Sequence, residues 1–188
     1  LFEVCRLRDL PIITFCNKMD RESRDNFEII DELQELLTID VVPMSWPVGA
    51  GKEFVGSYDL INNKITIMNR GDRNIIAPKF TINGLQDPNI SKYVPEHVLK
   101  VLHQEVEMIK GLLPDFNSEM FLSGNMTPLW FGSAINSFGI KELLDGIIKF
   151  APSPQPRPTL TRQVKPTEKA VTGFVFKIQA NMDQKHRD

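Results

Sequence analysis

The sequence predicts an α/β fold in which a mostly parallel sheet is flanked by helices. Residues 10–16 form an unbroken apolar and β-branched run, which is typical of a strand buried on both faces. Residues 128–131 form a second such run. Each run is followed by a polar loop and then by apolar residues at helical spacing, at 27–37 and at 140–148. Because the order strand, loop, helix occurs twice, we expect both strands in one parallel sheet.

The helix after the first strand has a recognisable beginning. Asp25 can act as its N-cap, and Glu28 stands three places later, as in a capping box. The residues expected to face inward are Phe27, Ile30, Leu33 and Leu37.

A partly β insertion is expected between about residues 46 and 94. A short apolar run at 41–45 precedes it. The stretch from 54 to 68 alternates between apolar and polar residues, and Asn62-Asn63 is its natural turn, so it predicts a β-hairpin.

Two amphipathic helices are expected further along the chain. Pro95 fits the first position of a helix over residues 95–113. The core-facing residues expected on that helix are Val98, Leu102, Val106, Ile109 and Leu113. The inward-facing residues expected on the helix that follows the second strand are Ile140, Leu143, Leu144, Ile147 and Ile148.

A domain boundary is expected after residue 151, which ends a first domain of residues 1–151. Residues 152–158 contain four prolines, which cannot continue a helix and suit an extended linker. Residues 171–178 alternate as a first strand would, so residues 159–188 are expected to begin a β-domain.

The composition excludes several classes of protein. The 188 residues carry 22 Lys plus Arg against 24 Asp plus Glu, and this net charge of −2 argues against a DNA-binding surface. No run of about 18 apolar residues could span a bilayer, so no membrane partner is expected. Cys5 and Cys16 lack a third thiol or a close His, so no metal site is expected. We expect a cytoplasmic protein, and the start at Leu1 without Met indicates a piece of a longer chain.

The loop Asn17-Lys18-Met19-Asp20 has the residue types that guanine recognition needs. The Asp20 carboxylate can accept two parallel hydrogen bonds from guanine N1 and N2, a pattern that adenine lacks. The Asn17 amide can hold the loop and meet the acceptor edge of the base, while the stem of Lys18 lies across its face. The alternative is a polar loop closed by an Asx-type turn. The place of the loop directly after a buried strand favours a binding site over this alternative.

The loop Gly132-Ser133-Ala134 ends the second predicted strand and is the expected partner of the first loop. A backbone N–H there could donate to guanine O6, and the small residues let a base approach closely. Taken alone, this sequence is also common in ordinary loops. Ligands of open α/β sheets bind beyond the carboxyl ends of the strands, where both loops are expected.

Gly49-Ala50-Gly51-Lys52 is similar to a phosphate-binding loop but departs from the pattern G-x-x-x-x-G-K-[ST]. Trp46 occupies the first glycine position and Glu53 the Ser/Thr position. A glycine-permitted turn is therefore expected here.

With both loops placed, the chain resembles the translational GTPases, and among them the family of bacterial peptide chain release factor 3. The family of elongation factor G is similar in the NKxD loop, the Gly-x-x-Asp-Leu hairpin and the Ser-Ala loop, and it is the enzymatic alternative. The stretches that carry the resemblance are LPIITFCNKMDRESRD at 10–25, PMSWPVGAGKEFVGSYDL at 43–60, GSAINSFGIKELLDGIIKFAPSP at 132–154 and FVFKIQANMDQKHRD at 174–188.

The resemblance implies part of a P-loop GTPase G domain followed by the start of a β-barrel domain. It implies GTP and GDP binding with magnesium in the intact protein, and GTP hydrolysis on the ribosome. There the protein would promote the release of class I release factors during translation termination. Carried over by position, Asn17, Lys18 and Asp20 read guanine, and Ser133 with Ala134 completes the base pocket.

The family's phosphate loop, magnesium-binding switches and catalytic His have no counterpart in residues 1–188. We therefore expect no catalytic residue here, no GTP hydrolysis by this piece alone and no tightly bound nucleotide. Neighbouring strands would also be missing, so exposed sheet edges could cause self-association. A non-enzymatic module that binds a ribosome or a protein is a further alternative, with an incidental NKMD loop.

Overall fold

The computed structural model describes residues 2–8, 10–21, 24–68 and 78–178. The chain divides into two compact units, Leu1–Ala151 and Pro152–Asp188. Within the described ranges, no helix is long and apolar enough to cross a membrane.

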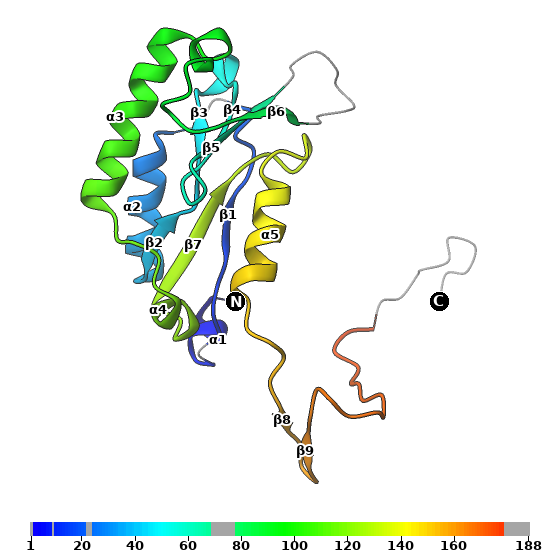
Figure 1. The fold of residues 1–188 in the computed structure, drawn as a ribbon. Helices are drawn as coiled ribbons and strands as arrows, with labels where there is room; N and C mark the ends of the chain where they lie inside the picture. The colour runs from blue at the N-terminus through cyan, green and yellow to red at the C-terminus, as the bar shows by residue number, and fades with distance from the viewer. Residues whose placement is uncertain (1, 9, 22–23, 69–77, 179–188) are drawn as a thin grey trace, which may run out of the picture. The chain divides into compact units, whose positions relative to one another are not determined.

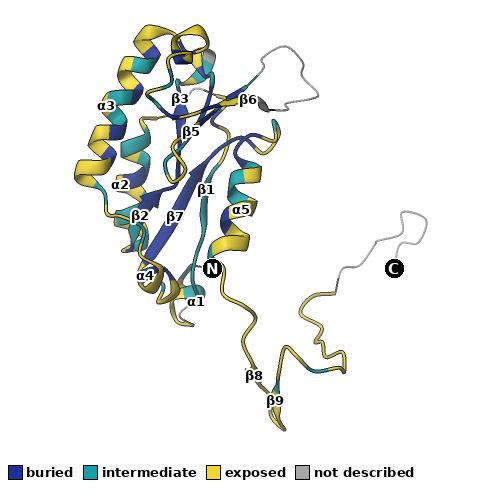
Figure 2. Ribbon diagram, viewed as in Figure 1, coloured by how far each residue is buried: buried dark blue, intermediate teal, exposed yellow. Residues whose placement is uncertain are grey.

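A three-stranded parallel sheet forms the centre of the first unit, in the order β1-β7-β2 (Figure 1). The predicted α/β fold with a parallel sheet is therefore confirmed. Its strands are β1 (Thr14–Cys16), β2 (Asp40–Pro43) and β7 (Met126–Phe131). Every residue of β7 is buried, as Figure 2 shows by its dark blue colour, because β7 lies between the other two strands.

Helices cover both faces of this sheet. Leu129 and Phe131 of β7 belong to a cluster that includes Ile30 of α2 (Asn26–Leu37), whereas Trp130 packs in a second cluster with Leu143 of α5 (Ile140–Phe150). Successive side chains of a strand point to opposite faces, so one buried strand contributes to two cores.

The predicted helix boundaries agree closely with the structure. Asp25 is the N-cap of α2, and its carboxylate accepts hydrogen bonds from the N–H groups of Phe27 at 2.8 Å and Glu28 at 3.4 Å. The long helix α3 covers Glu96–Leu112, so Pro95 is its N-cap and not its first helical residue. Its buried residues are Val98, Leu102, Val106 and Ile109, while Leu113 is its half-buried C-cap. The short helices α1 (Phe2–Arg6) and α4 (Ser118–Leu122) were not predicted.

The first strand is shorter and less buried than its sequence suggests, which corrects the prediction for residues 10–16. Gly132 N donates to Cys16 O at 2.9 Å, and by this spacing the N–H of residue 128 would donate to the carbonyl of Ile12. Pro128 has no N–H, and the Thr127 hydroxyl donates to that carbonyl instead, at 2.8 Å. The ladder therefore begins at Thr14, and β1 is half-buried because it lies at an edge of the sheet.

Helix α5 presents a different face to the sheet from the one predicted. Ile140 and Leu143 are half-buried, as expected, and Gly146 is buried against Trp130. The apolar residues that were expected inward but are exposed are Leu144 (52%), Ile147 (38%) and Ile148 (82%). The apolar residues form one wide face of the helix, and the close approach at Gly146 places one edge of that face, rather than its middle, against the sheet.

The predicted insertion forms a second, antiparallel sheet in the order β3-β4-β5-β6. Strands β4 (Gly56–Asp59) and β5 (Lys64–Met68) are the predicted hairpin, with the turn of residues 60–63 between them. The outer strands are β3 (Ser45–Val48) and β6 (Pro78–Ile82), and single 3-10 turns occupy Gly51–Glu53 (η1) and Ile90–Lys92 (η2). Two hydrogen bonds join this sheet to β7, from Met44 N to Leu129 O at 2.8 Å and from Phe131 N to Ser45 Oγ at 3.1 Å.

The second unit has little regular structure among its described residues. Strands β8 (Arg157–Pro158) and β9 (Gln163–Val164) form a small antiparallel pair. The strand predicted at 171–178 is absent, and its apolar residues are exposed, with Phe174 at 86% and Phe176 at 85%. A strand needs a partner for its backbone groups, and nothing in the described part of this unit pairs with it. Residues 69–77 of the predicted insertion and 179–188 of the predicted β-domain lie outside the described residues.

Candidate functional site

The structure brings the two predicted loops together. They follow β1 and β7, which are neighbouring parallel strands, so both leave the sheet at the same edge. Two backbone hydrogen bonds join them, from Gly132 N to Cys16 O at 2.9 Å and from Met19 N to Gly132 O at 3.0 Å. The sheet ladder therefore continues into the loops and fixes their relative position.

Asn17 connects the two loops through its side chain. The N–H of Ala134 donates to Asn17 Oδ1 at 2.9 Å, and the N–H of Lys18 donates to the same oxygen at 2.8 Å. Since both partners are donors, the amide oxygen must face the loops, which leaves Nδ2 as the donor for a ligand. The hydrogen bond from Lys18 lies within the first loop, as it would in a polar loop that closes on itself. The hydrogen bond from Ala134 instead joins the first loop to the second.

Three residues of the first loop face solvent and one, Met19, faces the core. Lys18 has a φ of 69°, in the left-handed region, and the N–H of Arg21 donates to its carbonyl at 3.1 Å. Lys18 and Asp20 are exposed, while Met19 is only 4% exposed and packs in the main core. The Met19 side chain therefore packs the loop against the core, while the side chains of Lys18 and Asp20 face solvent.

The second loop is also fixed from within. Ser133 is buried, and its N–H and carbonyl both bond to the backbone of Phe138 at 3.0 Å. Its hydroxyl accepts a hydrogen bond from the Asn136 side chain at 3.0 Å, whereas Ala134 is exposed. A Cβ at Gly132 would lie 2.3 Å from Phe138 O, so only glycine fits there. Ser133 thus shapes the loop, and Ala134 presents its backbone at the surface.

Sequence reasoning missed the anchoring role of Met19 and the structural role of Gly132. Met19 could have been noticed as a large apolar residue within a polar loop. The close approach at Gly132 has no local signal, because Phe138 comes from the far end of the same loop.

The exposed groups that the structure describes at this site suit polar recognition. Exposed groups at this edge are the Asp20 carboxylate, the Lys18 stem and the Asn17 amide. The Cys16 thiol lies beneath them, 3.8 Å from Met19 Sδ, and burial raises its pKa, so it is a poor nucleophile. Among the residues that the structure describes, no three His, Cys, Asp or Glu side chains gather as metal ligands.

The glycine-rich loop at residues 49–52 forms a turn, as predicted. Gly49 and Gly51 have φ values of 78° and 50°, and Glu53 N donates to Ala50 O at 2.9 Å. The Glu53 carboxylate pairs with His97 at 2.9 Å. A carboxylate at this position opposes phosphate binding.

Two comparisons relate the chain to known proteins. The family model of the elongation factor Tu GTP-binding domain matches residues 1–153. A crystal structure of a protein from Thermus thermophilus has a similar fold, with a TM-score of 0.50 and 19% sequence identity. That match covers 81% of this chain and 24% of the other, so this chain spans about a quarter of the protein that it matches. At this level of identity the likeness shows the fold alone.

Proposed function

The chain belongs to the elongation factor Tu GTP-binding domain family, and on that premise we propose that its two strand-end loops recognise the guanine base of GTP and GDP. The observation that carries the proposal is the hydrogen bond from Ala134 N to Asn17 Oδ1. It holds two loops, each with groups suited to one edge of a base, at the ligand-binding edge of a parallel sheet.

Each residue of the pocket has a distinct proposed role. Asp20 accepts hydrogen bonds from guanine N1 and N2, and Asn17 Nδ2 donates to the acceptor edge of the base. The stem of Lys18 covers one face of the base. Ser133 fixes its loop so that the backbone of Ala134 lies near O6. Because the Ala134 N–H already donates to Asn17, a guanine oxygen would share that donor.

The base-recognition proposal is tested with the intact protein and a labelled guanine nucleotide. Asp20→Asn is expected to weaken GDP binding and to favour xanthosine nucleotides, because the amide donates where xanthine has an acceptor. Asp31→Asn, on the exposed side of α2, is the matched control and should bind as the wild type does. Unchanged base preference in Asp20→Asn would mean that the pocket lies elsewhere.

We further propose that the intact protein is a GTPase of translation termination, which works with magnesium on the ribosome in the cytoplasm and promotes the release of class I release factors. The resemblance to the release factor 3 family at Trp46-Pro47, at Gly51-Lys52 and at residues 181–188 supports this reading. An elongation factor G-like translocase is equally compatible with the family. GTP-dependent displacement of a class I release factor from ribosomes supports the first reading, and GTP-dependent tRNA movement supports the second.

Residues 1–188 are proposed to have no hydrolytic activity of their own and to bind no nucleotide tightly. The 188 residues contain no G-x-x-x-x-G-K-[ST] sequence, and phosphoryl transfer depends on positioning by such a loop and its magnesium ion. Phosphate release from GTP above the buffer rate would overturn this proposal. A non-enzymatic binding module would instead retain its ribosome or protein partner without any guanine nucleotide.

A further inference from the structure

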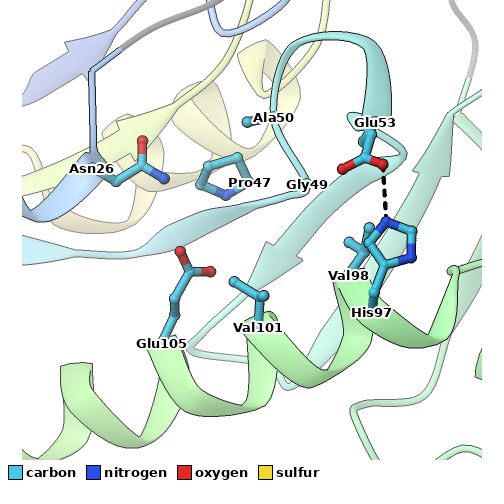
Figure 3. Close-up of a pocket in the computed structure, with 9 residues that line it drawn as sticks. All are labelled: Asn26, Pro47, Gly49, Ala50, Glu53, His97, Val98, Val101 and Glu105. Atoms are coloured by element: carbon cyan, nitrogen blue, oxygen red, sulfur yellow. Dashed lines mark hydrogen bonds and ion pairs between the residues drawn. The ribbon is translucent and has the colours of Figure 1, made fainter.

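A cavity of about 200 Å³ lies beside α3, and its lining residues include none of the proposed base pocket (Figure 3). Its apolar lining includes Pro47 of β3 and Val98 and Val101 of α3. Polar side chains lie toward two ends, with Glu105 and Asn26 at one end and Glu53 with His97 at the other. Nothing in the proposed guanine recognition uses this cavity.

The Glu105 carboxylate is held in place by an indole. Trp46 Nε1 donates to Glu105 Oε2 at 2.9 Å, and Trp46 itself is fully buried between Phe27 and Phe131. Burial raises the pKa of Glu105, the hydrogen bond from Trp46 opposes that change, and the charge of Asp25 adds to it. A half-buried carboxylate in this position is stabilised by a cation that enters the cavity.

The charged group at this end of the cavity is the Glu105 carboxylate, which can only accept hydrogen bonds when it is ionised. The Glu105 carboxylate has a second oxygen besides the one that accepts from Trp46. A ligand that complements this end must therefore bring donors and positive charge.

We propose that this cavity binds an alkylammonium group, whose N–H donors reach Glu105 and whose aliphatic part lies against Val98, Val101 and Pro47. An ammonium head supplies three donors and no acceptor, and its methylene stem suits an apolar wall. The described residues give no metal-ligand cluster, and the mixed lining fits an organic cation better than a bare ion. The same chemistry is available from a free aliphatic amine or from a lysine side chain.

Calorimetric titration of the intact protein with 1,5-diaminopentane tests this proposal, with sodium chloride at equal ionic strength as the reference. Binding is expected, and Glu105→Gln should weaken it by at least about tenfold, because a charge-assisted hydrogen bond is lost. The glutamine keeps an acceptor for Trp46. Glu107→Gln, on the same helix but exposed and outside the cavity lining, is the matched control and should bind normally.

A second variant keeps the test independent of the stability of Glu105→Gln. Val101→Phe adds bulk to the cavity wall from a half-exposed position and should also abolish binding. Titration with Nα-acetyl-lysine amide separates the two sources: comparable binding indicates that a lysine side chain can enter, and binding of the diamine alone indicates a free amine. Absence of heat beyond the salt reference, or equal binding by wild type and both variants, would overturn the proposal.

Discussion

Gly146 of α5 lies directly against the ring of Trp130, so that a Cβ built on Gly146 would stand 2.3 Å from Trp130 Cζ2. This contact sets how close α5 approaches the sheet. It also explains why the helix turns Leu144 and Ile148 toward solvent although both are apolar.

Gly146→Ala should destabilise the protein by about 1–3 kcal/mol, because the added methyl group pushes against an aromatic ring in a packed core. Gly111→Ala on α3 is the matched control, since a Cβ there meets nothing within 4 Å. It should stabilise the protein by up to about 1 kcal/mol through helix propensity. Urea unfolding of both variants measures the difference, and equal effects of the two substitutions would contradict the packing argument.

Asn17→Ala should loosen the two loops of the base pocket, because the N–H groups of Ala134 and Lys18 lose their shared acceptor. The groups lie at the surface, so water replaces part of the bond, and the loss of stability is about 0.5–1.5 kcal/mol. Amide hydrogen exchange at Ala134 should become faster. Gln104→Ala, at an exposed position of α3, is the control and should leave exchange at Ala134 unchanged.

The free energy of unfolding should depend on pH through Glu105. Its pKa in the folded protein is raised from the ordinary value of 4.5, chiefly by burial, so the folded state holds this proton more tightly than the unfolded state. Stability from this group is therefore present below about pH 4.5 and is lost as the pH rises through the folded pKa. Denaturant unfolding of the wild type and of Glu105→Gln, from about pH 4 to about pH 7, measures the effect. Glu105→Gln should not lose stability in this way as the pH rises. Parallel pH profiles of the two proteins would contradict the prediction.

Self-association should depend on the exposed apolar side of α5, which carries Leu144, Ile147 and Ile148. Apolar side chains gathered on one surface favour contact between copies, as does the open edge of β1. Ile148→Glu should lower the average mass seen in sedimentation velocity of residues 1–188. Leu36→Glu, at a 70% exposed position on α2, is the control and should have little effect. A concentration-independent monomer in the wild type would contradict the prediction.

The sequence by itself determined the features that depend on neighbours along the chain. Apolar runs and helical spacing predicted β7, α2 and α3, because a strand or helix must bury the side that its own residues make apolar. The Asp25 cap and the hairpin turn at Asn62-Asn63 are also local, since their bonding partners are a few residues away. The meeting of the two loops followed from the parallel order of the strands.

Tertiary structure decided the features that depend on shapes brought together from distant positions. Helix α5 has one wide apolar face, and the fit of Gly146 against Trp130 decides which edge of that face lies on the sheet. The start of β1 depends on Pro128, more than a hundred residues away, which cannot donate to the carbonyl of Ile12. The cavity at Glu105 likewise requires β3 and α3 to pack side by side. The periodicity of apolar residues is a property of each local segment. Packing and hydrogen-bond partners across the fold depend on complementary shapes from several segments, so no single segment determines them.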